Sequence, residues 1–511
     1  FVLLALLGMV IALVLDKMRP GMVLFSVVVL FLCVGILTPK EMLEGFSNKG
    51  MITVALLFLV SEGIRQSGTL GQVIKKLLPQ GKTTVFKAQL RILPSVAFIS
   101  AFLNNTPVVV IFAPIIKHWA KSVKLPATKF LIPLSYVTIL GGICTLIGTS
   151  TNLVVHGMIL EAGYEGFTMF ELGKVGIFIA IAGIIYLFIF SKRLLPDARP
   201  DTAVPDEEVE EGEKLHRVEA VLGARFPGIN KKLSDFNFQR HYGAEVKEIK
   251  TRNGQRYVDH LEDVVLREGD TLVVMADDTF IPTWGESSVF VLLTNGNDPD
   301  TSGKKKRWLA LILLVLMIVG ATVGELPATK EMFPDIKLDM FFFVCITTII
   351  MAWTNIFPAR KYTKYISWDI LITIACAFAI SKAMVNSGVA DCVAGFIIGL
   401  SDDYGPHVLL AILFVITNLF TELITNNAAA ALAFPLALSI SAQLGVSPTP
   451  FFVVICMAAS ASFSTPIGYQ TNLIVQGIGN YKFTDFVRIG LPLNIITFLI
   501  SVILIPLIWN F

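Results

Sequence analysis

The chain has 511 residues, of which 54% are hydrophobic and only 16% are charged, and its mean hydropathy is +0.71. This composition excludes an ordinary soluble domain, and a formal net charge of +2 gives no reason to expect a nucleic-acid partner. The sequence predicts a polytopic α-helical membrane protein. Segments near the ~20 apolar residues that cross a bilayer as a helix recur at 1–15, 20–37, 51–64, 130–147, 172–190, 308–325, 338–356, 367–385, 450–463 and 488–510.

Two polar interruptions mark the first predicted membrane part, residues 1–195. Segment 92–116 is apolar except at its centre, where Asn104, Asn105, Thr106 and Pro107 follow one another. Backbone that leaves a helix at membrane depth must face protein or a watery cavity, so we expect a re-entrant hairpin with a polar tip. The second interruption, GTSTN at 148–152, predicts a discontinuous helix.

A long polar segment, from about 191 to 307, separates the two membrane parts. Lys192 and Arg193 precede it and a basic cluster at 304–307 ends it, so the positive-inside rule predicts that it is cytoplasmic. Residues 196–214 form an acidic linker that is too charged to pack. Residues 215–303 are expected to form a small α+β domain, with strands at 216–222, 244–254 and 266–276, a helix at 229–243, and turns at Pro227-Gly228 and Asn253-Gly254.

The second membrane part, residues 304–511, shows the same kinds of interruption. Segment 408–441 is too long for one span and too short for two, and Glu422, Thr425, Asn426 and Asn427 lie near its centre. A second re-entrant hairpin fits these features. GYQTN at 468–472 predicts a second discontinuous helix.

An internal repeat relates the two parts. Residues 141–153 match 461–473 and residues 61–68 match 381–388, both at an offset of 320, and residues 100–114 match 421–435 at an offset of 321. The sequence therefore predicts two inverted repeats, each with a hairpin and a broken helix, and corresponding interruptions point to a transport site. The sequence contains no Walker loop, nucleophile elbow or metal-spaced carboxylates, so we do not expect an enzyme.

At these residues the chain resembles the divalent anion:sodium symporter family of the ion transporter superfamily. That family has a Ser-Asn-Thr triplet at each hairpin tip and a proline ten residues after the serine. The equivalents here are Asn104-Asn105-Thr106 with Pro114, and Thr425-Asn426-Asn427 with Pro435. The central asparagine is retained in both tips, whereas the flanking residues depart from the pattern and leave the substrate open.

The resemblance implies two sodium sites with an anion between them, on a transport domain that moves as an elevator against a dimer-forming scaffold. Sodium is the implied coupling ion, and no organic cofactor is expected. The implied residues, by position, are Ser100, Asn104, Asn105 and Gly148 for one sodium site, Thr421, Ile424, Asn426 and Gly468 for the other, and Asn105, Thr106, Asn426, Asn427, Thr151 and Thr471 for the substrate.

The inserted domain resembles the TrkA-C module of potassium-uptake regulatory subunits, in FPGINKKLSDFNFQRHYGAEVKEIKTRNG and LREGDTLVVMA. Such a module in this family favours sulfate as the substrate and a small regulatory ligand at the module. The expectation is a sodium-coupled sulfate symporter of the inner (plasma) membrane. A C4-dicarboxylate or other organic anion carrier and a membrane anion sensor remain alternatives, and Glu422 keeps proton coupling open.

Overall fold

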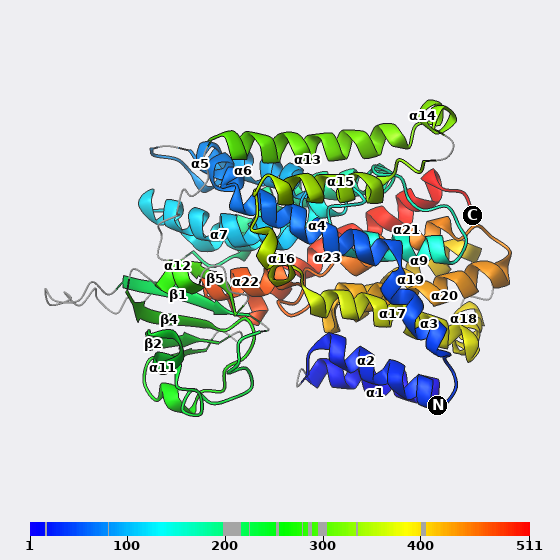
Figure 1. Ribbon diagram of the computed structural model, residues 1–511, viewed down its shortest axis with the longest axis horizontal. Helices are drawn as coiled ribbons and strands as arrows, with labels where there is room; N and C mark the ends of the chain where they lie inside the picture. Colours follow the sequence, from blue (N-terminus) through cyan, green and yellow to red (C-terminus); the bar gives the residue numbers. More distant parts are fainter. Residues whose placement is uncertain are drawn as a thin grey trace, which may run out of the picture.

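The structure is a computed structural model that describes residues 1–15, 18–79, 81–197, 216–223, 225–251, 255–277, 280–284, 289–294, 304–333, 336–399 and 405–511. Figure 1 shows an elongated helical bundle with a small β-sheet at one end of its long axis. Most of the predicted acidic linker, the Asn-Gly turn and the junction before the second membrane part lie outside the described residues.

Helices of the first membrane part begin and end at local signals. Thr38 and Glu41 form a capping box at the start of α3, the Asn48 side chain accepts from the Gly50 N–H at the start of α4, and Gly68 follows α4 in the left-handed region. The helices are α1 (Val2–Leu15), α2 (Pro20–Cys33), α3 (Pro39–Glu44), α4 (Lys49–Gln66), α5 (Thr69–Leu77), α6 (Val85–Ser100), α7 (Asn105–Ser122), α8 (Leu131–Gly142), α9 (Ser150–Glu161) and α10 (Gly173–Leu194).

Helix bounds in the second membrane part recur at the repeat offset. α2 spans 20–33 and α15 spans 340–353, which is a shift of 320 residues at both ends. The helices are α13 (Lys304–Gly324), α14 (Pro327–Met332), α15 (Met340–Trp353), α16 (Tyr362–Tyr365), α17 (Trp368–Asn386), α18 (Val389–Gly399), α19 (Gly405–Leu423), α20 (Asn426–Leu444), α21 (Thr449–Ser460), α22 (Gln470–Gly479) and α23 (Phe483–Ile508).

Exposed apolar rows identify the surface that faces lipid. On α23 the side chains of residues 491, 495, 499, 503 and 507, all Leu or Ile, recur every four residues, and each is at least half exposed. A monomeric soluble protein rarely exposes so continuous an apolar row. Seven helices among the described residues are long and apolar enough to cross a membrane. Five of the ten expected segments fall short because α1, α2, α8, α15 and α21 have only 12 to 14 residues, whereas α19 and α20 add two spans that were not among the ten. The fold is that of a multi-pass membrane protein.

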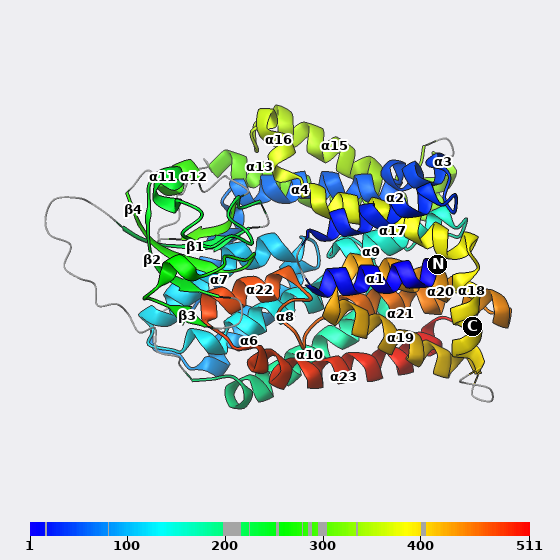
Figure 2. The ribbon, with the colours of Figure 1, turned by 90° about the horizontal axis from the view of Figure 1, so that it is seen from below.

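The two helix pairs that carry the polar tips lie at opposite ends of the bundle. α6 and α7 lie toward the sheet, and α19 and α20 lie toward the far end (Figures 1 and 2). α19 and α20 have 19 residues each, or about 28 Å at 1.5 Å per residue. Together the two helices cover 405–444, which is longer than the expected segment 408–441. The argument that this segment is too short for two spans is therefore wrong.

The small domain is an antiparallel five-stranded sheet in the order β3-β2-β4-β1-β5. Its strands are β1 (His216–Leu222), β2 (Glu245–Lys250), β3 (Arg256–Tyr257), β4 (Thr271–Ala276) and β5 (Phe290–Thr294), and its short helices are α11 (Phe238–Tyr242) and α12 (Phe280–Trp284). Of the helix expected at 229–243, only α11, residues 238–242, is helical. Asn230 has φ 62° and donates its N–H to the Leu266 carbonyl at 2.8 Å, so this stretch pairs along the chain near 264–266 instead of coiling.

The sheet domain rests on α7 and α22 (Figure 2). Lys117 of α7 donates to both carboxylate oxygens of Glu219 on β1, at 3.0 and 3.2 Å. A Cβ on Gly477 of α22 would lie 2.5 Å from the Thr271 hydroxyl of β4. The domain therefore contacts two helices whose other ends carry residues of the predicted transport site.

Candidate functional site

Four helices begin at the predicted polar interruptions near residues 105, 150, 426 and 470, which together are called the polar cluster. α7 begins at Asn105, α9 at Ser150, α20 at Asn426 and α22 at Gln470. At all four starts the side chain of the N-cap residue makes no capping hydrogen bond; these residues are Asn104, Thr149, Thr425 and Tyr469. The first N–H groups of each helix and its positive dipole end are thus directed at the cluster, an arrangement that suits an anion.

The two hairpins make the same polar contacts. In the first, the buried Ser100 hydroxyl lies 2.8 Å from Asn105 Oδ1 and 2.9 Å from the Thr138 carbonyl. In the second, the buried Thr421 hydroxyl lies 2.7 Å from Asn426 Oδ1 and 2.6 Å from the Ala459 carbonyl. Each hairpin therefore presents a compact pair of neutral oxygen atoms, which are ligands that suit an alkali or other hard cation.

The glycines of the two broken helices pack directly against these pairs. A Cβ on Gly142 would lie 2.7 Å from Asn105 Oδ1 and 3.1 Å from the Gly148 carbonyl. A Cβ on Gly468 would lie 2.5 Å from the Thr421 carbonyl and 2.0 Å from Ser462 Oγ. Only glycine permits this close approach, and Gly148 and Gly468 therefore bring their backbone close to the two oxygen pairs.

Two asparagines hold the broken segments in place. Asn152 Nδ2 donates to the Thr145 carbonyl at 2.9 Å, and Asn472 Nδ2 donates to the Ser462 carbonyl at 2.9 Å. Backbone groups outside a helix need such partners when water is excluded. These bonds explain why the final asparagine of GTSTN and of GYQTN recurs.

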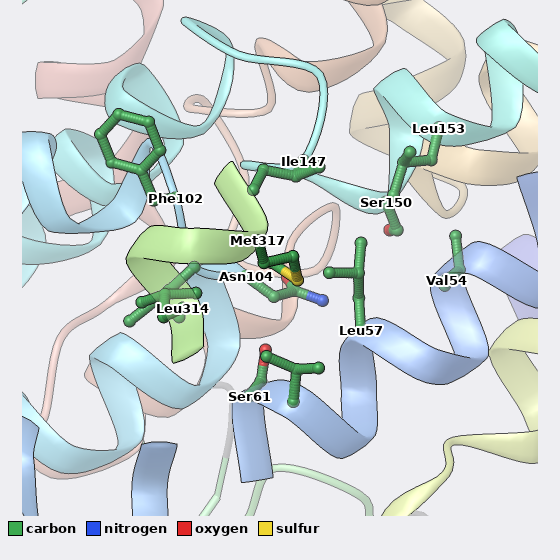
Figure 3. A pocket seen from close by; sticks show the side chains of 12 residues that line it. Val54, Leu57, Ser61, Phe102, Asn104, Ile147, Ser150, Leu153, Leu314 and Met317 are labelled. Atoms are coloured by element: carbon green, nitrogen blue, oxygen red, sulfur yellow. The ribbon is translucent and has the colours of Figure 1, made fainter. Parts of the chain in front are cut away.

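The remaining residues of the sodium assignment are placed differently in the two hairpins. Asn104 does not face the Ser100–Asn105 pair; its side chain lines a small pocket between α4, α9 and α13, near Ser61 and Ser150 (Figure 3). Ile424 is buried between α19 and α20, and its N–H donates to the Phe420 carbonyl at 2.8 Å. A second cavity, of about 1140 Å³, lies beside the C-terminal half of α9 and the N-terminal end of α15. Leu153 lines both this cavity and the small pocket.

The residues assigned to substrate fall into two groups. Thr106 Oγ1 donates to Gln470 Oε1 at 3.2 Å, and Asn427 Oδ1 accepts from Ser150 and Thr151 at 3.3 and 3.4 Å. Each tip therefore contacts the broken helix of the other half. Thr471 is not among these contacts, because its fully buried hydroxyl accepts from Ser135 of α8 at 2.8 Å.

Sequence reasoning missed Tyr469 and Gln470 and left the role of Glu422 open. The Tyr469 hydroxyl accepts from Asn105 Nδ2 at 2.5 Å and lies 3.2 Å from Thr149 Oγ1. The comparison of GTSTN with GYQTN could have shown this residue, since an aromatic ring replaces a threonine at equivalent positions. The Glu422 carboxylate accepts from the Ser464 and Thr465 N–H groups, both at 2.8 Å, and from Asn494 Nδ2 at 2.7 Å, so it holds the second broken segment.

The cluster has no charged partner for a bound ion in its immediate sequence. Residues 104–106, 143–150, 425–427 and 461–470 contain no Lys, Arg, Asp or Glu. Among the described residues, no group of three or more His, Cys, Asp or Glu could hold a metal ion. Apart from the Glu422 carboxylate beside its second half, the site is built from neutral amides, hydroxyls, carbonyls and helix ends.

Comparison of the sequence with known proteins identifies the family of the chain. The sequence profile described as "Citrate transporter" matches residues 10–440 and 332–511. An uncharacterized transporter of Synechocystis sp. is 29% identical over 95% of this chain and 93% of its own length. A Chlamydomonas reinhardtii protein named for a regulatory response to sulfur deprivation is 28% identical over 94% of this chain and 96% of its own length.

A third relative, sodium/sulfate cotransporter 2 of Chlamydomonas reinhardtii, is 30% identical over 55% of this chain and 31% of its own length. The profile, the Synechocystis relative and the cotransporter are transport proteins in name. Because the profile covers well over half of the chain, the chain belongs to the citrate transporter family, within the divalent anion:sodium symporter and ion transporter superfamily.

Proposed function

We propose that this transporter carries sulfate together with sodium across the inner (plasma) membrane. The observation that carries the proposal is the convergence of four helix starts without side-chain caps on one polar cluster that has no Lys or Arg. A desolvated dianion needs compensation. Helix ends and amide donors supply part of it, and co-bound cations supply the rest.

Sodium is assigned to the two oxygen pairs. One ion lies at Ser100 and Asn105 with carbonyls near Gly148, and the other at Thr421 and Asn426 with carbonyls near Ile424 and Gly468. These ligands do not titrate, which favours sodium over protons. The relative named as a sodium/sulfate cotransporter supports both the ion and the anion.

The transport cycle is assigned to an elevator motion of a dimeric protein. Its support is the recurrence of helix bounds at 320 residues and the contact of each tip with the broken helix of the other half. In this scheme the halves are inverted repeats, 216–294 belong to a cytoplasmic TrkA-C-like domain, and the cavity beside Leu153 leads to the site from the opposite side of the membrane.

Uptake into proteoliposomes tests this function. Purified protein is reconstituted, and radiolabelled sulfate uptake is followed with an inward sodium gradient and with a matched potassium gradient. We expect saturable accumulation above equilibrium with sodium only. Sulfate that enters with either cation, or only to equilibrium, would contradict sodium-coupled symport.

A membrane sensor is the second candidate. The relative named for a response to sulfur deprivation matches 94% of this chain, and the sheet domain rests on α7 and α22, which begin at the polar cluster. A sensor would bind sulfate in the reconstituted state without accumulating it. Parallel binding and uptake measurements on one preparation separate the two functions.

A further inference from the structure

The polar cluster is asymmetric although the two halves correspond. The first tip is defined as residues 104–106 and the second tip as residues 425–427. At the repeat offset Tyr469 corresponds to Thr149, and Gln470 to Ser150. The phenol of Tyr469 accepts from Asn105 Nδ2 at 2.5 Å, and Gln470 Oε1 accepts from Thr106 Oγ1 at 3.2 Å. The side chains of Asn105 and Thr106 are therefore already engaged by the protein, whereas Asn104 lines the separate small pocket.

The second tip retains unused donors. Asn426 Oδ1 accepts from Thr421, but among the described residues Asn426 Nδ2 has no hydrogen-bond partner. The buried hydroxyl of Thr425 also has none within the described part of the chain. Within the described residues, Asn427 forms hydrogen bonds only through Oδ1, at 3.3 and 3.4 Å. A buried hydroxyl without a partner is unusual, and together with the two neighbouring amides, whose Nδ2 groups make no hydrogen bond within the described residues, it indicates a place for an acceptor.

The difference follows from one side chain. Thr149 is shorter than tyrosine by a whole ring, and among the described residues it makes no hydrogen bond to the second tip, whereas Tyr469 reaches across to the first tip. A ligand with an anionic group at each end would need donors from both tips. The second anionic group of such a ligand would lie at the first tip, beside the Tyr469 phenol and an Asn105 amide that is already hydrogen-bonded. It would find no free donor at these two side chains, and a charge left unpaired in a desolvated site is costly.

We propose that Tyr469 determines the substrate class: it fills the first tip, so that the site accepts a compact tetrahedral oxyanion at the second tip and rejects an extended dicarboxylate. The inference rests on the proposed function for the location of the site. Thr425, Asn426 and Asn427 donate to the oxyanion, and the N–H groups at the start of α20, a helix of 19 residues, add donors. Sites whose polar groups match one ligand discriminate strongly against another that leaves groups unpaired.

Binding to the purified protein tests the inference apart from transport. Isothermal titration with sulfate and with succinate, in sodium buffer, is compared for the wild type, Tyr469→Thr and Tyr469→Phe. The threonine variant places the residue of the first broken helix in the second, while the phenylalanine variant keeps the ring. We expect the wild type to bind sulfate at least tenfold more tightly than succinate and Tyr469→Thr to lose at least tenfold of that preference. Tyr469→Phe, which frees the Asn105 amide but keeps the ring, should lose less of it than Tyr469→Thr.

Wild-type competition keeps the test independent of how the variants fold. Selenate should displace sulfate, whereas malonate, succinate and glutarate should all fail to do so, whatever their length. Dicarboxylates that bind the wild type as tightly as sulfate, failure of both ligands to bind, or a folded Tyr469→Thr variant with unchanged preference would each overturn the inference. Sulfate that binds selectively but is not accumulated would overturn the transport function and leave the inference standing.

Discussion

Removal of the Glu422 carboxylate is expected to loosen the second broken segment. Three donors converge on this side chain: the N–H groups of Ser464 and Thr465 and the side-chain amide of Asn494. The next residues toward α22 include Gly468, whose backbone packs against Thr421. We therefore expect substitutions of Glu422 to act on stability and on the second sodium site together.

The magnitude follows from the number of donors left without an acceptor. A buried donor that loses its partner costs roughly 1–3 kcal/mol. Glu422→Ala orphans three donors, which sets a ceiling of about 9 kcal/mol when no water replaces the carboxylate. Glu422→Gln keeps one acceptor oxygen and turns an amide group toward one donor, so about 1–3 kcal/mol is expected. That range corresponds to about 5- to 160-fold in an equilibrium constant.

The assay measures thermal unfolding in detergent and the sodium concentration for half-maximal sulfate uptake. Glu331→Gln is the matched control, because Glu331 lies exposed on α14 and surface substitutions change stability little. We expect Glu422→Gln to lower the unfolding temperature and raise the half-saturating sodium concentration, Glu422→Ala to do both more strongly, and the control to do neither.

The reasoning would be refuted by a Glu422→Gln protein with the wild-type unfolding temperature and sodium dependence. Proton coupling makes a different forecast. In that case wild-type uptake would be driven by an inward proton gradient without sodium, and a normally stable Glu422→Gln protein would lose this uptake.

Three further predictions concern the hairpins and the sheet domain. Gly468→Ala, whose Cβ would lie 2.5 Å from the Thr421 carbonyl, should reduce sodium affinity at least fivefold in uptake assays, while Gly8→Ala in open space should leave it unchanged. Asn105→Ala and Asn426→Ala should each abolish sodium-dependent uptake with normal expression; normal uptake in both would remove the assignment of sodium to these residues. Burial opposes ionisation of Glu219, but Lys117 and Lys250 lower its pKa to about 2 from 4.5. Its stabilising contribution is therefore complete above about pH 4.5 and is lost as the pH falls toward 2, which hydrogen exchange in β1 should detect in the wild type and not in Glu219→Gln.

The positions of the polar interruptions could be predicted from the sequence because helix breaks need particular residues. Asn105, Asn426, Gly148 and Gly468 stand out from apolar surroundings, and in the structure α7 begins at Asn105, α20 begins at Asn426, and the two glycines lie just before α9 and α22. The strands β1, β2 and β4 were likewise predictable, because each is a short stretch that contains β-branched residues.

Contacts between the halves could not be predicted, because they depend on how the tips meet in space. Tyr469 and Thr471 lie two residues apart in GYQTN, yet the tyrosine reaches the first tip and the threonine turns to Ser135. A helical periodicity also predicted too long a helix at 229–243, since Asn230 and Leu233 donate to the 264–266 stretch instead. Tertiary hydrogen bonds overrode local preference in both places.

The contact of the sheet domain with α7 and α22 suggests a way to block the proposed transport cycle from outside the polar cluster. Lys117 lies twelve residues after Asn105, and Gly477 lies seven after Gln470, so the contacts are about 18 Å and 10 Å along rigid helices from the tips. Through α7 and α22, the sheet domain is thus connected to both halves of the polar cluster. An antibody fragment that clamps this domain to a neighbouring helix end should arrest transport without contacting the polar cluster, and one that binds the β3 edge of the sheet should leave transport unchanged.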